Sequence, residues 1–202
     1  MKQQGRAAGL SRLAGTPTGR RLGDKKTGKD KVGQRGKAGE ASVREALKAL
    51  ALEYGFFDWM RLPDARTAGG RIGRQTGDFL LFAPGMHGVI ETKDLDHDFR
   101  LPRGRMIKDD KDKGTSNNSI ERLWRRQEAG GLIFVLVHHT TTGAWRAVPL
   151  AYLHANQALP SWNLSGFTAC ASARQALKGL EASLQTQAES APRAGFGGLP
   201  CR

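Results

Sequence analysis

Hydrophobic residues first recur at helical spacing ahead of Gly55. Val43, Leu47, Leu50 and Tyr54 are separated by four, three and four positions, which predicts a helix with one buried face. Glycine is common just after a helix C-terminus, so the helix is expected to end there. Its start is expected just after residue 37.

Two short apolar runs joined by turn residues predict a β-hairpin. The first strand is Asp78–Phe82, the second is Val89–Lys93, and the stretch between them holds a proline and two glycines. We expect Phe82 to face Val89, which puts Asp78 opposite Lys93. Glu91 then lies diagonal to Asp78 on the same face of the sheet, because side chains alternate along a strand.

The remaining pattern predicts one central strand and several shorter elements. Leu132–Val137 is apolar on both faces, as in a strand covered on both sides. Asp94–Lys113 is dense in charge and is expected to form a mobile loop. The other expected elements are a strand at Phe56–Leu62, a helix at Ile120–Ala129, a strand at Ala144–Val148, a short helix from Pro149 to Gln157 and an alanine-rich helix over Ser172–Gln187.

Charge is concentrated at the start of the chain. The 202 residues carry a formal net charge of +13, and residues 1–37 contribute +9 of it. This segment has no aromatic residue and too little apolar surface to offset the entropy of ordering, so we expect it to be disordered. An excess of lysine and arginine of this kind favours a polyanion as partner; a solubilising tail is the alternative.

Other compositional features exclude several classes of protein. No apolar run reaches the length of a transmembrane helix, and the N-terminus lacks the apolar core of a signal peptide. Cys170 and Cys201 show neither zinc-binding spacing nor a disulfide framework. We therefore expect a reducing, cytoplasmic setting and no membrane partner.

The hairpin carries the candidate chemistry. Asp78 and Glu91 on one face would place two carboxylates close enough to hold one hard divalent cation, with Lys93 beside them. A surface ion pair between Asp78 and Lys93 is the structural alternative. Glu40 lies one turn before Val43–Leu47, on the side of the helix that is expected to be buried. Alternatively, Glu40 is only an acid in the first turn that the helix dipole favours.

An acid at the start of one strand followed by Glu-x-Lys on the next resembles the PD-(D/E)xK nuclease core. Gly77-Asp78 stands for the Pro-Asp, and Glu91-Thr92-Lys93 for the (D/E)xK. The order helix, three strands, helix, strand is similar to the αβββαβ core of restriction-endonuclease-like proteins. Within that superfamily, Lys37-Ala38-Gly39-Glu40 and the glycine-led strand after Gly131 resemble the RecU-type and archaeal-type Holliday junction resolvases.

The resemblance implies a fold, a cofactor and roles for particular residues. The fold would be α/β, a mixed central sheet flanked by helices, with a disordered basic tail. Asp78, Glu91, the main chain of Thr92 and Glu40 would bind Mg²⁺ or Mn²⁺, and Lys93 would orient water or offset charge. Gln127 is an accessory candidate. Arginines before Asp78 and on the second helix are expected to contact DNA, namely Arg66, Arg71, Arg74, Arg122, Arg125 and Arg126.

Three functions remain open at this stage. The first is a metal-dependent endonuclease that resolves four-way junctions as a homodimer; the second is another PD-(D/E)xK DNA nuclease, used in restriction, replication or DNA degradation; the third is a non-catalytic nucleic-acid-binding protein. We expect a basic tail over residues 1–37, a nuclease core over 38–168 and a C-terminal helix and tail over 169–202. A small basic enzyme of this kind also suits a phage or prophage.

Overall fold

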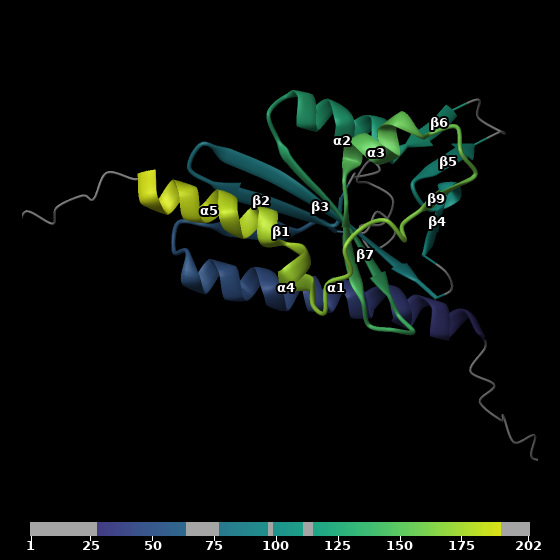
Figure 1. The fold of residues 1–202 in the computed structure, drawn as a ribbon, viewed down its shortest axis with the longest axis horizontal. Coiled ribbons are helices and arrows are strands. Elements are labelled where there is room, and N and C mark those ends of the chain that lie inside the picture. Colours follow the sequence, from purple (N-terminus) through teal and green to yellow (C-terminus); the bar gives the residue numbers. More distant parts are fainter. Residues whose placement is uncertain (1–27, 64–76, 97–98, 111–114, 191–202) are drawn as a thin grey trace, which may run out of the picture.

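Five strands form one mixed sheet in the spatial order β1-β2-β3-β7-β8 (Figure 1). The structure is a computed structural model, and it describes residues 28–63, 77–96, 99–110 and 115–190. Strands β3 and β7 are parallel, and the other neighbours in the sheet are antiparallel. The five strands are β1 (Asp58–Arg61), β2 (Phe79–Ala83), β3 (Met86–Leu95), β7 (Leu132–His139) and β8 (Trp145–Val148).

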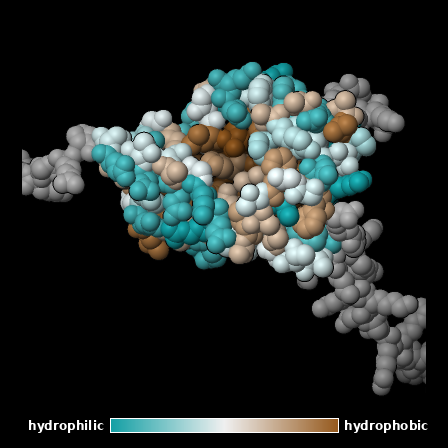
Figure 2. All heavy atoms as spheres, in the orientation of Figure 1, coloured by the Kyte–Doolittle hydropathy of each residue, from teal (hydrophilic) through white to brown (hydrophobic). Residues whose placement is uncertain are grey.

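Helices cover both faces of this sheet, which confirms the predicted mixed α/β architecture (Figure 1). One face packs against α1 (Gly28–Glu53), α4 (Ala173–Ala176) and α5 (Lys178–Ser190). The other face packs against α2 (Ser119–Glu128) and α3 (Leu150–Ala155). In the space-filling view, apolar residues reach the surface in the hollow between α2 and α5, where the sheet lies between the two helical layers (Figure 2).

The predicted hydrophobic patterns are buried as expected in α1 and β7. Val43, Leu47 and Leu50 are fully buried on the inner side of α1. Along β7, Leu136 packs on the α1 side, whereas Val135 and Val137 pack on the α2 side. The prediction of a central strand with two apolar faces is therefore confirmed.

Helix α1 begins earlier than the apolar pattern indicates. It starts at Gly28, so residues 28–37, expected in a disordered tail, are helical. Residues 28–37 can be helical without a buried apolar face, because lysine, arginine and glutamine have high helix propensity. Each residue added to an existing helix also gains one hydrogen bond. The expectation of disorder for residues 1–27 lies outside the described residues.

The charged stretch after β3 is not simply a loop. It contains β4 (Arg100–Pro102), the 3-10 helix η1 (Arg103–Arg105) and β5 (Ile107–Asp110). Strand β4 pairs with β9 (Ser161–Asn163), and β5 pairs with β6 (Thr115–Asn118). Leu101, Met106 and Ile107 are buried, and these single apolar residues hold the segment against the sheet despite the surrounding charge.

The turn of the hairpin is shorter than predicted and changes its register. Ala83 pairs with Met86 around the two-residue turn Pro84-Gly85, in which Gly85 has a φ of 68°, a conformation that glycine adopts without strain. The predicted pairing of Phe82 with Val89 is therefore wrong: Phe82 pairs with His87, a shift of two residues. A shift of two keeps every side chain on its predicted face, whereas a shift of one would reverse them all.

No helix in the described part of the chain is both long enough and apolar enough to cross a membrane.

Candidate active site

Asp78, Glu91 and Lys93 meet where β2 begins beside the middle of β3. Phe79 pairs with Ile90, so Asp78, one residue before the strand, stands opposite Glu91 rather than Lys93. The main-chain N–H of Asp78 donates to the Ile90 carbonyl at 2.7 Å, and the Thr92 N–H donates to Asp78 Oδ2 at 2.6 Å. These bonds fix the Asp78 carboxylate against β3.

Lys93 forms an ion pair with Glu91 on the α2 side of the sheet. Its Nζ donates to Glu91 Oε1, and both residues lie between the buried Val89 and Leu95 along β3. The structural alternative considered above, an ion pair of Lys93 with Asp78 on the surface, is not formed. Glu91 is only 7% exposed, so the charges meet in a largely enclosed position.

Burial and neighbouring charges alter the proton affinities at this position. Burial and the nearby Glu91 carboxylate raise the pKa of Asp78 to about 7, against the opposing effects of Lys93 and the Thr92 N–H; Glu40 adds to the rise. Burial lowers the pKa of Lys93, but the charges of Glu91 and Asp78 outweigh this effect, and the Lys93 pKa is raised. Asp78 therefore holds a proton far more readily than an exposed aspartate does.

The donor atoms suit a hard divalent cation. Asp78 and Glu91 offer carboxylate oxygens from facing strands, and burial together with the Glu91 charge outweighs the opposing effect of Lys93 on the pKa of Asp78. No group of three or more His, Cys, Asp or Glu side chains able to hold a metal is found in the described ranges. A cation here would thus rest on two carboxylates and main-chain oxygen, and Mg²⁺ commonly keeps waters for its remaining positions.

Glu40 approaches the site from α1, on the opposite face of the sheet, and is paired with β1. The Nε and Nη2 of Arg61 donate to Glu40 Oε2 at 2.9 and 2.5 Å. Phe57, Trp59 and Arg61 alternate along the chain and all three contact the α1 layer. Sequence reasoning missed the Glu40–Arg61 pair, although the alternation along β1 was a usable signal.

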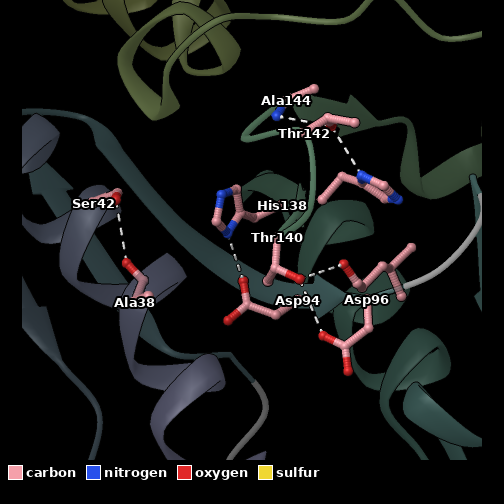
Figure 3. Close-up of polar contacts among 10 residues, drawn as sticks. Ala38, Ser42, Asp94, Asp96, His138, Thr140, Thr142 and Ala144 are labelled. Atoms are coloured by element: carbon pink, nitrogen blue, oxygen red, sulfur yellow. Dashed lines mark hydrogen bonds and ion pairs between the residues drawn. The ribbon is translucent and has the colours of Figure 1, made fainter.

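A second buried acid lies next to Glu40. Asp94 Oδ1 is 3.0 Å from His138 Nδ1 (Figure 3). The His138 ring stacks on Trp145 with centroids 4.5 Å apart. A Cβ added to Gly39 would fall within 3.0 Å of Asp94 Oδ1 and 3.1 Å from its Cγ. Gly39 therefore lets α1 approach β3 closely at the residue before Glu40. The sequence singled out neither Asp94 nor Gly39 for this role.

Threonine hydroxyl groups form further hydrogen bonds at the ends of β3 and β7. Thr140 Oγ1 donates to Asp96 Oδ1 at 3.1 Å, and His139 Nδ1 lies 2.9 Å from Thr142 Oγ1 (Figure 3). The adjacent His138 and His139 at the end of β7 thus both form hydrogen bonds within the chain. Burial raises the pKa of Asp94, and the His138 hydrogen bond opposes the rise.

The predicted DNA-binding arginines are only partly placed. Arg66, Arg71 and Arg74 lie outside the described residues. On α2, Arg125 is exposed, and Arg122 and Arg126 are partly exposed with contacts of their own. Gln127 is exposed near the end of α2, which leads into Leu132 opposite Gly88 of β3. This is the hairpin end of the strand, and Gln127 is not brought to the carboxylates.

No protein-family model matches the chain, and no curated protein matches it. Among solved structures, the chain is similar to Hjc of Archaeoglobus fulgidus, a Holliday junction resolvase from an archaeal hyperthermophile. The two are 16% identical, the match covers 63% of this chain and 94% of that chain, and the TM-score is 0.39. A TM-score this low supports no conclusion about fold or function, so the proposals below rest on the residues of the chain itself.

Proposed function

We propose that the chain is a metal-dependent DNA endonuclease with a PD-(D/E)xK active site at Asp78, Glu91 and Lys93. The observation that carries the proposal is the meeting of these three side chains on adjacent strands, with the pKa of Asp78 raised to about 7. Strongly perturbed acids that face another charged group are typical of functional sites. A purely structural ion pair would need only one of the two carboxylates.

Asp78, Glu91 and the main-chain carbonyl of Thr92 would hold Mg²⁺ or Mn²⁺. When bound, the cation would polarise the scissile phosphate and lower the pKa of a bound water. The Thr92 N–H holds one oxygen of Asp78 and thereby orients the other. Glu40 would act on the metal shell through water, since Arg61 occupies its Oε2.

Lys93 has two tasks in this proposal. Paired with Glu91, it holds that carboxylate in place. Its raised pKa keeps the ammonium charged at neutral pH, so it can orient the attacking water or stabilise the negative charge that develops on the phosphate.

DNA, branched in the favoured case, is the proposed substrate. The net charge of +13 supports a polyanionic partner, and Arg125 on α2 is available to contact a phosphate together with Arg66, Arg71 and Arg74. Resolution of a four-way junction needs two cuts, and a homodimer would supply two sites. The exposed apolar residues Leu52, Met60 and Phe82 are candidate parts of a dimer interface.

The catalytic unit in this proposal spans residues 38–168. Helices α4 and α5 belong to the segment 169–202, yet Leu177, Leu180 and Leu184 are buried in the same core as α1. This segment would therefore support the fold of the catalytic unit rather than act separately.

Two other functions remain candidates. Another DNA nuclease of the same superfamily would use the same three residues on linear or flapped DNA. A non-catalytic nucleic-acid-binding protein would need the positive charge but not the paired carboxylates, whose mutual repulsion costs stability. The presence of both carboxylates beside Lys93 therefore favours an enzyme.

Cleavage of a four-way junction and of a linear duplex of the same sequences separates these functions. Each substrate is incubated with Mg²⁺, with Mn²⁺ and with EDTA. We expect paired cuts in the junction only with a metal present. Metal-dependent cleavage of the linear duplex alone would favour the general nuclease, and binding without any cleavage would favour the non-catalytic protein.

A further inference from the structure

The 3-10 helix η1 lies on the same side of the sheet as Glu91 and Lys93. Met106, which directly follows it, is 1% exposed and packs in one core cluster with Val89 and Leu95. These two residues flank Glu91 and Lys93 along β3. Arg105, the neighbour of Met106, therefore lies on the face of the sheet that carries Glu91 and Lys93.

The backbone of η1 is fixed on both sides of Arg105. Before it, the Arg103 N–H donates to the Pro160 carbonyl at 2.9 Å, and Arg103 Nε donates to the Gln157 carbonyl at 3.1 Å. After it, the Met106 carbonyl accepts a hydrogen bond from Ser119 N–H at 3.1 Å, at the start of α2. A side chain delivered by a fixed turn loses less entropy on binding than one on a free loop.

The charge of Arg105 has no counter-ion within the described ranges. The side chain is exposed and forms neither an ion pair nor a hydrogen bond there. Its positive charge lies close enough to Lys93 to repel the charge of that side chain. Two neighbouring cations repel each other, whereas an anion placed between them is attracted by both. Lys93 is 19% exposed at its side chain, so an anion at the surface can reach both groups.

We propose that Arg105 is a phosphate-binding residue that takes a DNA phosphodiester next to the one at Asp78, Glu91 and Lys93. This inference rests on the proposed nuclease function and adds a residue to it. A guanidinium suits the task because its planar N–H groups can donate two parallel hydrogen bonds to phosphate oxygens. Arg105 would thus hold the strand on the α2 side of the site.

The test compares Arg105→Gln, Arg105→Lys and the wild-type chain. Binding of a fluorescent four-way junction is measured in EDTA over a range of salt concentrations. Lys178→Gln is the matched control, because it removes the same charge from an exposed position at the start of α5, on the opposite face of the sheet. Thermal unfolding of each variant checks that the fold is intact.

Arg105→Gln should weaken binding roughly tenfold or more, since it removes a charge-assisted hydrogen bond. It should also reduce the slope of log K against log salt by about 0.9, the value for one lost phosphate contact on duplex DNA. Arg105→Lys should keep the slope and recover only part of the affinity. Lys178→Gln should resemble the wild type.

The contacted phosphate can be located with single methylphosphonate substitutions along the DNA. One substitution should weaken the wild-type chain but not Arg105→Gln, within one or two phosphates of the bond that is cut when Mg²⁺ is added. An unchanged slope for Arg105→Gln, an equal loss for Lys178→Gln or a distant phosphate would overturn the role of Arg105 alone. A wild-type chain that neither binds nor cuts DNA would overturn the nuclease function, and this inference with it.

Discussion

Replacement of Gly39 by alanine tests the close approach of α1 to β3. The new methyl group would lie within 3.0 Å of Asp94 Oδ1, 3.1 Å from Cγ and 3.2 Å from Oδ2. Asp94 has little room to yield, because its side chain is 8% exposed and its Oδ1 contacts His138, which itself stacks on Trp145. Relief therefore requires a shift of α1 or the loss of the Asp94–His138 contact.

The size of the effect follows from two opposing contributions. Overpacking of a filled site costs about 1–3 kcal/mol, whereas alanine in place of glycine within a helix gains about 0.5–1 kcal/mol. We expect a net loss of about 1–2 kcal/mol in the free energy of unfolding. Gly179→Ala in α5 is the control, since its methyl group would meet Phe134 Cε1 at an ordinary 3.5 Å. That variant should gain about 0.5–1 kcal/mol.

Urea denaturation followed by circular dichroism measures both variants against the wild type. In an Asp94→Ala background, which removes the obstructing carboxylate, Gly39→Ala should become neutral or stabilising. Because Glu40 follows Gly39, the single variant should also cleave DNA more slowly than the wild type. The reasoning is refuted if Gly39→Ala is as stabilising as Gly179→Ala, or if its cost is the same with and without Asp94.

Three further predictions concern the carboxylates and the basic N-terminal segment. Asp78→Asn or Glu91→Gln should abolish Mg²⁺-dependent cleavage and leave DNA binding in EDTA within a few-fold of the wild type; turnover at the wild-type rate would remove these residues from the active site. The folded-state pKa of about 7 for Asp78 exceeds the unfolded value of about 4, so the folded chain holds the extra proton between these values. The extra proton on Asp78 stabilises the fold fully below about pH 4, and this stabilisation is lost as the pH rises through 7. In EDTA, the wild type should therefore lose more stability between pH 5 and 8 than Asp78→Asn does. Parallel pH profiles of the two proteins would contradict this prediction. Deletion of residues 1–27 should weaken DNA binding and flatten its salt dependence by about 0.9 per lost phosphate contact, and an unchanged slope would mean that the segment does not touch DNA.

Local pattern alone determined most of the secondary structure. The stripe of Val43, Leu47 and Leu50 defines the inner side of α1, and the doubly apolar run in β7 defines a central strand. Strand alternation also placed Asp78, Glu91 and Lys93 on one face, a result that survived the two-residue error in register because the side-chain period is two. Each of these features depends on residues that are close together in the chain.

Contacts between distant segments were decided by the tertiary structure. The partner of Glu40 is Arg61 on β1, and the room for Gly39 is set by Asp94 at the end of β3. Likewise, the charged stretch with Arg105 is held on the sheet by the isolated apolar residues Leu101 and Met106. Local periodicity places a side chain on one face but does not identify its partner, because the partner depends on how elements pack in three dimensions. The sequence therefore predicted the pair of carboxylates, and the packing of α1 and of the segment around Met106 determined what surrounds them.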